Sequence, residues 1–276
     1  MKISLSTEQV RRFHEQGFLA VPQITTSAEV SFVRGIYDNL FDKHAGWERG
    51  DFFDFAGEDR FGRTASVPQM LDPATHEPAL KDTMFRTNAQ QIAKQLLGPG
   101  AELVFEHAMM KPAHIGGETP WHQDEAFYPR FTNYRSITFW MPLQAVDIEN
   151  GCLDFIPGSN AGPLLTHRSI DNNPKIHGLE AVGVDASNAV ACPLEAGGAT
   201  IHAYRTLHHA GPNLTGGPRR AYSLGFGVRS AAYTLRADFP WNAEKATARM
   251  QRADEVQGTV QRHFRQLKNR IKAVVR

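Results

Sequence analysis

The first hundred residues carry the apolar spacing of amphipathic helices. A capping-box pattern at Ser6 and a stop signal at Gly17 predict a helix over about 7–16. Another capping-box pattern begins at Thr26 and opens a longer helix. The apolar stripe of that helix follows the 3.6-residue period and consists of Val30, Val33, Ile36, Tyr37, Leu40 and Phe41. A third helix is expected over about 86–97.

From residue 101 onward the pattern changes to short stretches of β-branched and aromatic residues separated by turns. The pair Asn150 and Gly151 is a strong hairpin signal among them. Strands are expected over about 102–110, 135–143, 152–156, 189–193, 198–204 and 220–229, after a short first one at 18–22. A helical pattern over about 242–275, with a break expected at Gly258, ends the chain. Because helices come first, strands next and a helix last, the order predicts a β sandwich or barrel core with helices packed outside it.

Two long segments between these elements lack a clear period. Residues 44–70 mix glycines, charges and aromatic residues, and residues 160–188 are polar and rich in turns. Long loops in compact domains are commonly lids or binding loops, so we expect both segments to shape a ligand site. Two interpretations stay open for Trp47, Phe52 and Phe55: contact with an apolar or aromatic ligand, or packing against the helices.

Composition and charge narrow the class of protein. The chain has 276 residues, of which 41% are hydrophobic, and its 30 basic and 29 acidic side chains leave a net charge of +1. This balance is typical of a globular protein, excludes a largely disordered chain and gives no support to a nucleic-acid partner. No apolar run is long enough for a membrane span, and the N-terminus has no apolar signal-peptide core. Basic residues near the C-terminus have the helical spacing of a solvated face: Arg262, Arg265, Lys268, Arg270, Lys272 and Arg276.

Length and cysteine usage bear on domain organisation and compartment. A chain this long buries a full core without disulfides or structural metals. We therefore expect one domain over 1–276, with a helical part over about 1–100, a β core over about 101–230 and C-terminal helices over about 242–275. Cys152 and Cys192 have no CxxC or metal-type spacing, so a reducing, cytoplasmic compartment is expected.

One short motif has the pattern of a metal site. In the run from Trp121 to Asp124, His122 and Asp124 are two residues apart, at a point where a strand is expected to begin. Residues i and i+2 of a strand point to the same side, so both side chains can face one metal ion. The motif alone is weak, but a distant second histidine would complete the 2-His-1-carboxylate set that non-haem Fe(II) oxygenases use.

A series of short motifs makes the chain resemble the phytanoyl-CoA dioxygenase family of Fe(II)/2-oxoglutarate oxygenases. The motifs occur in the family's order over most of the chain and are specific together, although each is weak alone. They are Gly17 to Pro22, Lys111 with Pro112, Trp121 to Asp124, Asn150 to Leu153, Ile156 to Ser159, Arg205 to His208, Gly211 to Asn213 and Pro218 to Ala221. The resemblance implies a mainly β fold, a double-stranded β-helix or cupin-like jelly roll with flanking N- and C-terminal α-helices.

The resemblance also implies metal and cosubstrate ligands. His122 and Asp124 match the family's first two iron ligands. The family's distal histidine stands five residues before an asparagine and eleven before an arginine. His208 fits both spacings, the second through Arg219, whereas His209 misses each by one. In the family that arginine holds the far carboxylate of 2-oxoglutarate, a role that suits a bidentate and permanently charged guanidinium.

Strand parity supports Arg219, and not its neighbour Arg220, as the arginine that faces the site. This argument does not depend on the resemblance. One face of the expected strand carries Arg219 with the small residues Ala221, Ser223 and Gly225, which fits a cavity wall. The other face carries Arg220 with Tyr222, Leu224 and Phe226, which fits packing under outer helices. For Arg220 itself we expect an exposed charge at a strand edge.

Other positions near the site are open to two interpretations. Trp140 stands where family members carry a tryptophan near the cosubstrate, yet a tryptophan in a strand is equally a core residue. Lys111 and Met109 lie on the strand that enters the site, and they either line the pocket, with Lys111 as a cosubstrate contact, or are ordinary strand residues. The chain departs from many relatives at Asn160, where they have histidine, and at Ala210, where they often have serine. The second departure removes one hydrogen bond to the 2-oxoglutarate carboxylate and leaves that task to a donor that the sequence does not identify.

Together these features predict a dioxygenase that uses Fe(II), 2-oxoglutarate and O2. It would hydroxylate a C–H bond of a small-molecule metabolite and release succinate and CO2. Because Asp124 is present, a related halogenase, in which a small residue replaces the metal carboxylate, is disfavoured. A cupin-type metal-dependent hydrolase or isomerase, which would not need Arg219, and a non-catalytic metabolite-binding module both stay open. The substrate class, among acyl-CoA, amino acids, phosphonates and secondary metabolites, and the oligomeric state are left open.

Overall fold

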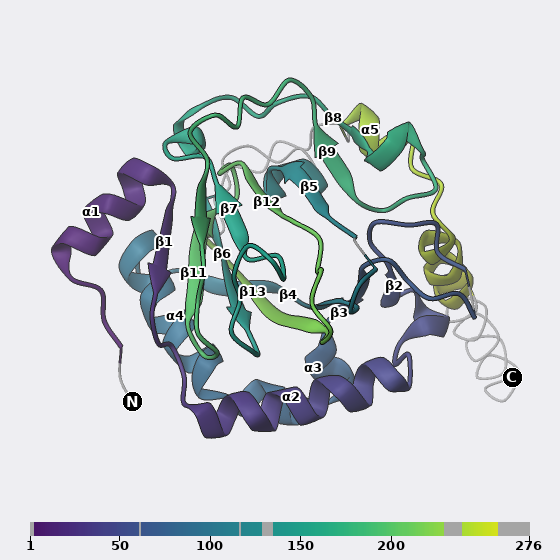
Figure 1. The fold of residues 1–276 in the computed structure, drawn as a ribbon, viewed down its shortest axis with the longest axis horizontal. Coiled ribbons are helices and arrows are strands. Elements are labelled where there is room, and N and C mark those ends of the chain that lie inside the picture. The colour runs from purple at the N-terminus through teal and green to yellow at the C-terminus, as the bar shows by residue number, and fades with distance from the viewer. Residues whose placement is uncertain (1–2, 61, 116, 129–134, 229–238, 259–276) are drawn as a thin grey trace, which may run out of the picture.

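The computed structural model describes residues 3–60, 62–115, 117–128, 135–228 and 239–258. Its centre is a pair of antiparallel β-sheets, and helices cover the outer face of the larger sheet (Figure 1). The β core with external helices that the element order predicts is therefore confirmed.

The larger sheet has seven strands in the order β1-β11-β6-β13-β4-β3-β2. Their bounds are β1 Phe18–Val21, β2 Phe52–Asp54, β3 Pro68–Leu71, β4 Glu102–Lys111, β6 Arg135–Pro142, β11 Ala199–Ala203 and β13 Arg219–Val228. The central strand β13 pairs with β4 on one side and β6 on the other. Its register sets Ser223 between Trp140 of β6 and His107 of β4, so these three residues form one row on the same face of the sheet.

The smaller sheet has four strands in the order β10-β7-β12-β5. Their bounds are β5 Thr119–His122, β7 Leu153–Phe155, β10 Val190–Cys192 and β12 His208–Ala210. This sheet faces the inner side of the larger one, because Trp140 and Ala221 of the larger sheet share an apolar cluster with Leu153 and Phe155 of the smaller. A separate two-stranded sheet pairs β8 His167–Ser169 with β9 Leu179–Ala181.

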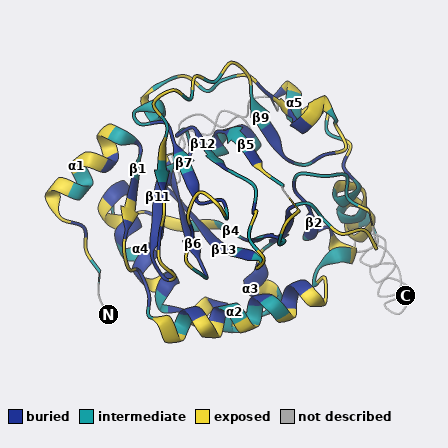
Figure 2. Ribbon diagram, in the orientation of Figure 1, coloured by how far each residue is buried: buried dark blue, intermediate teal, exposed yellow. Residues whose placement is uncertain are grey.

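Helices α2 and α4 pack on the outer face of the larger sheet, with their buried sides turned toward it (Figure 2). The α-helices are α1 Thr7–Gln16, α2 Ser27–Asp42, α3 Pro73–His76, α4 Met84–Leu97 and α5 Pro240–Ala243, and 3-10 turns occupy Trp47–Arg49, Pro78–Asp82, Asp124–Phe127, Ser159–Ala161 and Ile170–Asn172. The stripe expected for α2 faces the core, although Ile36 is only partly buried. None of the helices in the described part of the chain is long and apolar enough to cross a membrane.

Helix α4 begins at Met84, two residues before the expected start, because two side chains accept hydrogen bonds from its first backbone N–H groups. The hydroxyl of Thr83 accepts from Arg86 N at 3.3 Å. The carboxylate of Glu29, on α2, accepts from Met84 N at 2.5 Å and from Phe85 N at 2.9 Å. The same acidic side chain therefore caps one helix and ties it to the other.

The two segments expected to be irregular contain short strands. Residues 44–70 include β2 and most of β3, and residues 160–188 include β8 and β9. Side chains alternate along β2, so Phe52 packs under the helices, edge-on to Phe41 at 5.5 Å between ring centroids, while Phe53 lies on the inner side. The aromatic residues of this segment are thus divided between the helical layer and the interior.

The C-terminal helix is broken earlier than expected. Helix α5 is short, residues 244–247 are not helical, and the helix resumes over 248–258, through Gly258. The hydroxyl of Thr247 accepts a hydrogen bond from Met250 N at 3.4 Å, an N-cap arrangement that starts this second helix. Gly258 is the last described residue of this helix, so the break expected there stays a prediction. The remainder of the expected helix, 259–275, and its basic residues lie outside the described residues.

Candidate metal centre

Three side chains able to bind a metal meet between the two sheets. His122, Asp124 and His208 each offer one ligand atom, and these atoms lie within 4.8 Å of one another. Asp124 Oδ1 is 3.7 Å from His122 Nε2 and 3.5 Å from His208 Nε2. The structure therefore brings together the three residues selected from the sequence, as a 2-His-1-carboxylate cluster.

Strand pairing sets the two histidines side by side. His208 of β12 lies directly opposite His122 of β5, with 4.1 Å between the ring centroids. His122 is the last residue of its strand, and Asp124 opens a 3-10 turn. The expectation that a strand begins at this motif is therefore wrong. A turn, rather than the pleat of a strand, carries Asp124 back to His122.

Backbone carbonyls hold both imidazole rings in the state that binds a metal. His122 Nδ1 lies 2.7 Å from the carbonyl oxygen of Pro120, and His208 Nδ1 lies 2.9 Å from that of Thr206. A carbonyl only accepts hydrogen bonds, so each Nδ1 carries the proton and each Nε2 presents its lone pair to the cluster. Burial and the neighbouring His208 lower the pKa of His122 well below its usual range, which keeps that ring neutral.

Asp124 divides its two carboxylate oxygens between the cluster and the larger sheet. Oδ2 accepts a hydrogen bond from the hydroxyl of Thr138 at 2.7 Å and lies 3.3 Å from Nε2 of His202. Thr138 and His202 are opposite each other on β6 and β11. Burial alone would raise the pKa of Asp124, but His208 and His202 hold it well below its usual range. The carboxylate is therefore charged and oriented in advance, with Oδ1 toward the histidines.

A cavity of about 300 Å³ opens beside the cluster. Its walls come from the inner face of the larger sheet, from the smaller sheet and from residues beside β2 and β3. Trp140, Met109 and Ser223 are among the residues that line it. Trp140 is at once a cavity residue and a member of the apolar cluster between the sheets, so both interpretations offered for it describe its place.

Arg219 is a cation without a partner in the cavity wall. Its side chain is 1% exposed, and within the described residues none of its three guanidinium nitrogens has a hydrogen-bond partner. Its Cζ lies 5.3 Å from the ring centroid of Trp140. Burial lowers the pKa of Arg219 to about 9. A buried guanidinium without an acceptor is costly, so the donor set fits a ligand carboxylate, which takes two parallel hydrogen bonds.

Arg220 points to the opposite side of β13, as strand parity predicts. Its Nε donates to Asp38 Oδ1 of α2 at 2.5 Å. The neighbouring Tyr222 packs against Tyr37 and Phe85 under the same helical layer. The expectation of an exposed charge at a strand edge is wrong, because β13 is a central strand and an aspartate covers the guanidinium.

Lys111 lies behind the cavity and does not line it. Its side chain is 1% exposed, and its ammonium donates to the carbonyl oxygens of Ala210 at 2.8 Å and Gly211 at 2.5 Å. Lys111 is also the register partner of Arg219, so the larger sheet is tied here to the end of β12. Of the two strand residues considered, only Met109 forms part of the wall.

His209, the alternative to His208, has its ring engaged elsewhere. The ring stacks on Trp121 at 5.2 Å between centroids, and Nδ1 lies 3.1 Å from Asp154 Oδ2. His209 borders the cavity, but successive residues of β12 point to opposite sides, and the cluster contains His208.

Thr138, His202 and Thr119 are among the polar residues of the site that sequence reasoning missed. Thr138 and His202 hold Asp124, and they lie within strands that were expected, so placing them needed the pairing between those strands. Thr119 lines the cavity, is buried, and its hydroxyl has no hydrogen-bond partner in the described part of the chain. It lies directly opposite Ala210, the position where the expected serine is missing. No sequence signal links Thr119 with Ala210. Only the pairing of β5 with β12 brings them together.

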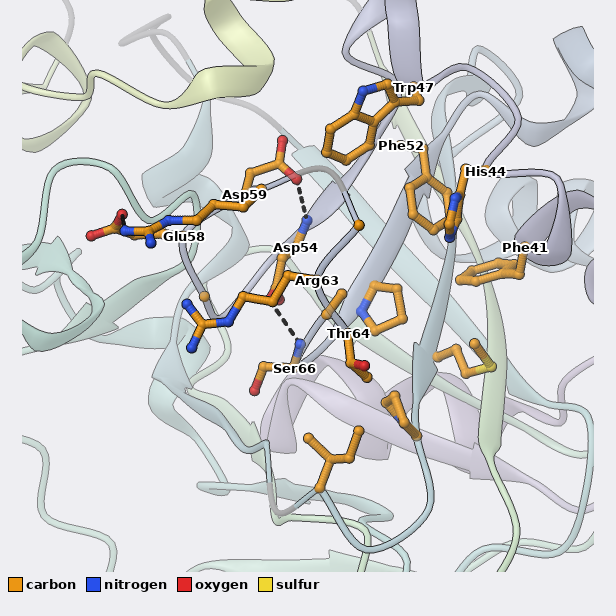
Figure 3. Close-up of a pocket in the computed structure, with 18 of the residues that line it drawn as sticks. Phe41, His44, Trp47, Phe52, Asp54, Glu58, Asp59, Arg63, Thr64 and Ser66 are labelled. Carbon is orange, nitrogen blue, oxygen red and sulfur yellow. Dashed lines mark hydrogen bonds and ion pairs between the residues drawn. The ribbon is translucent and has the colours of Figure 1, made fainter.

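A larger cavity, of about 780 Å³, shares no lining residue with the first (Figure 3). Three of its acidic side chains are already engaged. The carboxylate of Asp54 accepts from the backbone N–H groups of Ser66 and Val67 at 2.7 and 2.9 Å, Asp59 pairs with Arg252, and Glu58 pairs with Arg60. These contacts shape the segment between β2 and β3, so we place the functional site in the smaller cavity.

Comparisons with known proteins agree on one family of dioxygenases. The family model described as phytanoyl-CoA dioxygenase matches residues 13–221. A probable alpha-ketoglutarate-dependent hypophosphite dioxygenase of Stutzerimonas stutzeri is 25% identical over 231 residues, which cover 81% of this chain and 79% of that protein. The phytanoyl-CoA dioxygenase of Arabidopsis thaliana is 26% identical over 251 residues, which cover 80% and 88%.

Solved structures share the fold. The crystal structure of EvdO2 from Micromonospora carbonacea var. aurantiaca, complexed with 2-oxoglutarate, matches with a TM-score of 0.73 and 35% identity, over 89% of this chain and all of that one. The non-heme alpha ketoglutarate dependent carbocyclase SnoK from nogalamycin biosynthesis matches with a TM-score of 0.67 and 24% identity, over 86% and 89%. The cupin-like jelly roll implied by the motifs is confirmed.

Proposed function

This chain belongs to the phytanoyl-CoA dioxygenase family of Fe(II)/2-oxoglutarate-dependent oxygenases, and from that premise we propose that it hydroxylates a C–H bond of a small molecule, with release of succinate and CO2. Its cofactors are iron, 2-oxoglutarate and O2. One observation carries the proposal: a cavity holds both a 2-His-1-carboxylate cluster and an unpaired, buried guanidinium. The first suits Fe(II), and the second suits the free carboxylate of a bound keto acid.

In the proposed site, His122, Asp124 and His208 hold the iron. The carbonyls of Pro120 and Thr206 accept from Nδ1 of the two imidazoles and so turn each Nε2 toward the cluster, and Asp124 supplies Oδ1. When bound, iron with 2-oxoglutarate and O2 supplies the oxidising chemistry, in which one oxygen atom goes to succinate and the other to the substrate. The protein contributes orientation and a site shielded from bulk water.

Arg219 and Thr119 are proposed to bind the far carboxylate of 2-oxoglutarate. Both line the cavity, and both carry donors without partners among the described residues. They lie at the same end, because Arg219 is the register partner of Lys111, the ammonium of Lys111 reaches Ala210 O, and Ala210 pairs with Thr119. Thr119 is thus our candidate for the donor missing at Ala210. Lys111 is proposed to act as a positioning residue, in place of the direct cosubstrate contact expected from the sequence.

A hydrolase or isomerase would use the same metal ligands but would leave Arg219 without a function. Hydrolysis needs a metal-activated water and a polarised bond, and neither requires a second buried cation with three free nitrogens. A binding module without turnover would not need Thr138 and His202 to orient Asp124. We therefore propose neither.

Compartment and substrate are also proposals. Cys152 and Cys192 are both free thiols, which supports a reducing, cytoplasmic compartment. The relatives carry different substrates in their names, hypophosphite in one and phytanoyl-CoA in another. Shared ligands on a shared fold fix the reaction type more closely than the substrate, so for this chain we propose a small molecule that fits the cavity beside the iron.

The proposed function is tested by an anaerobic titration of the metal-free protein with Fe(II) and then 2-oxoglutarate. Chelation of the keto acid at the iron produces a visible charge-transfer band, which we expect for the unaltered protein and not for His122→Ala. Succinate release in air then allows a substrate screen. Binding of Fe(II) without a band on adding 2-oxoglutarate would contradict the cosubstrate assignment.

A further inference from the structure

The cavity beside the metal cluster extends well past the groups used in the proposed function. Its lining includes residues of β4, β3 and the segment after β2, at the edge of the larger sheet. Strand β2 is the third strand from β13, which carries Arg219. At about 4.8 Å between neighbouring strands, the two lie roughly 14 Å apart. The metal ligands are held from the other side, through Thr138 of β6 and His202 of β11. This far end is therefore free to contact substrate.

Arg249 contributes a cation to the wall of the far end. It comes from the helical segment 248–258, and its Cζ lies 4.6 Å from the ring centroid of Phe53 on β2. Its Nε donates to the carbonyl oxygen of Gly50 at 2.9 Å. Its two Nη groups make no hydrogen bond or ion pair with any described residue. One face and the Nε of the guanidinium are thus fixed, while its two Nη groups have no partner among the described residues.

The backbone at Gly50 is built for this approach. Gly50 has a φ of +73°, and a Cβ there would lie 2.3 Å from the carbonyl oxygen of Arg249. Any other residue would push the C-terminal helix away from β2. The position of Arg249 therefore follows from close docking of two distant segments and not from a flexible surface side chain.

Lys245 adds a second cation beside the first. Its Nζ lies 4.9 Å from the ring centroid of Phe127, which lines the cavity. Burial and the charge of Arg249 lower the pKa of Lys245 to about 7. Burial, together with Lys245 and Arg249, also lowers the pKa of His177, another lining residue, well below its usual range. Two cations thus lie close enough to repel each other, Arg249 in the cavity wall and Lys245 next to the lining residue Phe127 but outside the lining itself.

Nearby carboxylates do not neutralise this wall. Asp59 pairs with Arg252, Asp51 lies beside His76, and Glu106 is held by Arg86 and Tyr222. Asp72 also lines the cavity but makes no ion pair in the described residues, and burial and Glu106 raise its pKa. Asp51, Asp59 and Asp72 interact with Arg249 by charge, but burial outweighs them and lowers its pKa, so an anion bound at the two unused Nη groups would stabilise the guanidinium.

Resting on the function proposed above, we propose that Arg249, assisted by Lys245, binds an anionic group of the substrate, a carboxylate or a phosphate. The aromatic and apolar side chains between the two ends, among them Phe55, Phe105 and Leu71, would contact an apolar body. The substrate class is thus a small apolar molecule with an anionic end. The anion is held at the edge of the sheet, and a C–H bond of the body lies toward the metal.

The test compares anionic and neutral probes of the same shape. Phenyl phosphate, phenylacetate and benzyl alcohol are titrated calorimetrically into the anaerobic protein already loaded with Fe(II) and just-saturating 2-oxoglutarate. The visible band is followed in parallel, so that a probe that displaces 2-oxoglutarate is recognised. We expect at least one anion to bind about tenfold more tightly than benzyl alcohol. The stronger of the two anions identifies a phosphate or a carboxylate as the preferred group.

Substitutions then test which residues cause the tighter binding of the anionic probes. Arg249→Gln is expected to abolish the tenfold difference while benzyl alcohol binds as before, and Lys245→Met is expected to reduce it. Arg168→Gln is the matched control, because this exposed arginine pairs with Glu180 at 2.8 Å and does not line the cavity. Arg168→Gln should keep the full difference.

Three results would overturn the inference. They are equal binding of anions and alcohol to the unaltered protein, a preference that survives Arg249→Gln, and a preference that disappears equally in Arg168→Gln. If Arg249 only fastens the helix to Gly50, Arg249→Gln lowers the melting temperature and leaves the preference intact. Should Arg249→Gln fail to fold, an unchanged preference in Lys245→Met overturns the proposal. Absence of the band in the unaltered protein would instead contradict the proposed function, so the two failures are distinguishable.

Discussion

The two ends of the cavity are built in different ways. At the metal end, strand pairing places His208 opposite His122 and Thr138 opposite His202, and a short turn that follows β5 carries Asp124. At the far end, the wall comes from segments that are distant in the chain and meet through single side chains, such as Arg249 on Phe53. A rigid sheet thus carries the groups for the shared chemistry, and interchangeable segments carry the groups that select a substrate.

The contrast predicts how each end responds to substitution. Removing a group at the metal end should affect binding of metal or cosubstrate whatever the substrate is. Removing a group at the far end should change which probe binds and leave the metal alone. The following substitutions are ordered from the largest expected effect to the smallest.

The largest effect is expected for His208→Ala, which removes a metal ligand. Turnover of 2-oxoglutarate, measured as succinate release, should fall to background. His209→Ala is the matched control, because its ring is engaged with Trp121 and Asp154 and should be largely dispensable. The reverse result, with loss of turnover in His209→Ala alone, would overturn the choice of ligand.

Arg219→Ala should weaken 2-oxoglutarate binding by about a hundredfold, since it deletes one partner of a buried charge pair. Titration of the visible band gives the dissociation constant for 2-oxoglutarate, and a separate metal titration gives the Fe(II) affinity. We expect the Fe(II) affinity to change little, because Arg219 does not contact the metal cluster. Equal losses of both affinities would contradict a role in cosubstrate binding.

Thr138→Val should weaken Fe(II) binding by about tenfold, because it removes the hydrogen bond that orients Asp124. Ser136→Ala is a suitable control, since Ser136 is a buried residue of the same strand whose hydroxyl has no partner among the described residues. A metal titration distinguishes the two variants. Identical affinities would mean that Asp124 is oriented without Thr138.

Thr119→Val should raise the dissociation constant of 2-oxoglutarate by about tenfold, the low end of the value of one hydrogen bond to a charged group. Adding Ala210→Ser in the same chain places a hydroxyl directly opposite and should restore part of the affinity. Thr200→Val is the control, because that buried threonine also has an unpaired hydroxyl in the described residues but lies outside the cavity. Failure of Ala210→Ser to improve binding, with Thr119→Val unimpaired, would exclude this donor.

The elements that the sequence predicted well are those with a local cause. The capping box of α1, the Thr26 cap that starts α2 and the parity of β13 depend on neighbours within one element, and each appears as expected. The second half of the box expected at Thr26 does not form, because the Glu29 side chain caps α4 instead. The three residues of the proposed metal cluster were selected because short motifs in family order carry them, and the structure brings them together. Arg219 was separated from Arg220 by alternation alone.

The features that the sequence did not predict depend on contacts between distant elements. The prediction of an exposed environment for Arg220 was wrong because the sequence pattern of an edge strand is the same as that of a central strand. Only the order in which the strands pair distinguishes the two. Thr119 was missed because its significance comes from the strand opposite. Strands β2 and β3 were missed because each is only three or four residues long and is stabilised by pairing in the larger sheet.

The hydrogen bonds from Lys111 to Ala210 and Gly211 have a consequence for the choice of cosubstrate. They join the sheet that carries Arg219 to the end of the strand that carries His208, so the span between the metal and the carboxylate anchor is fixed. This fixed distance limits the length of the keto acid that can bind at both ends. A keto acid one carbon shorter than 2-oxoglutarate would reach the metal or the guanidinium but not both. A keto acid one carbon longer would have to adopt a bent conformation to fit between them. We therefore expect the proposed site to select its cosubstrate by length as well as by charge.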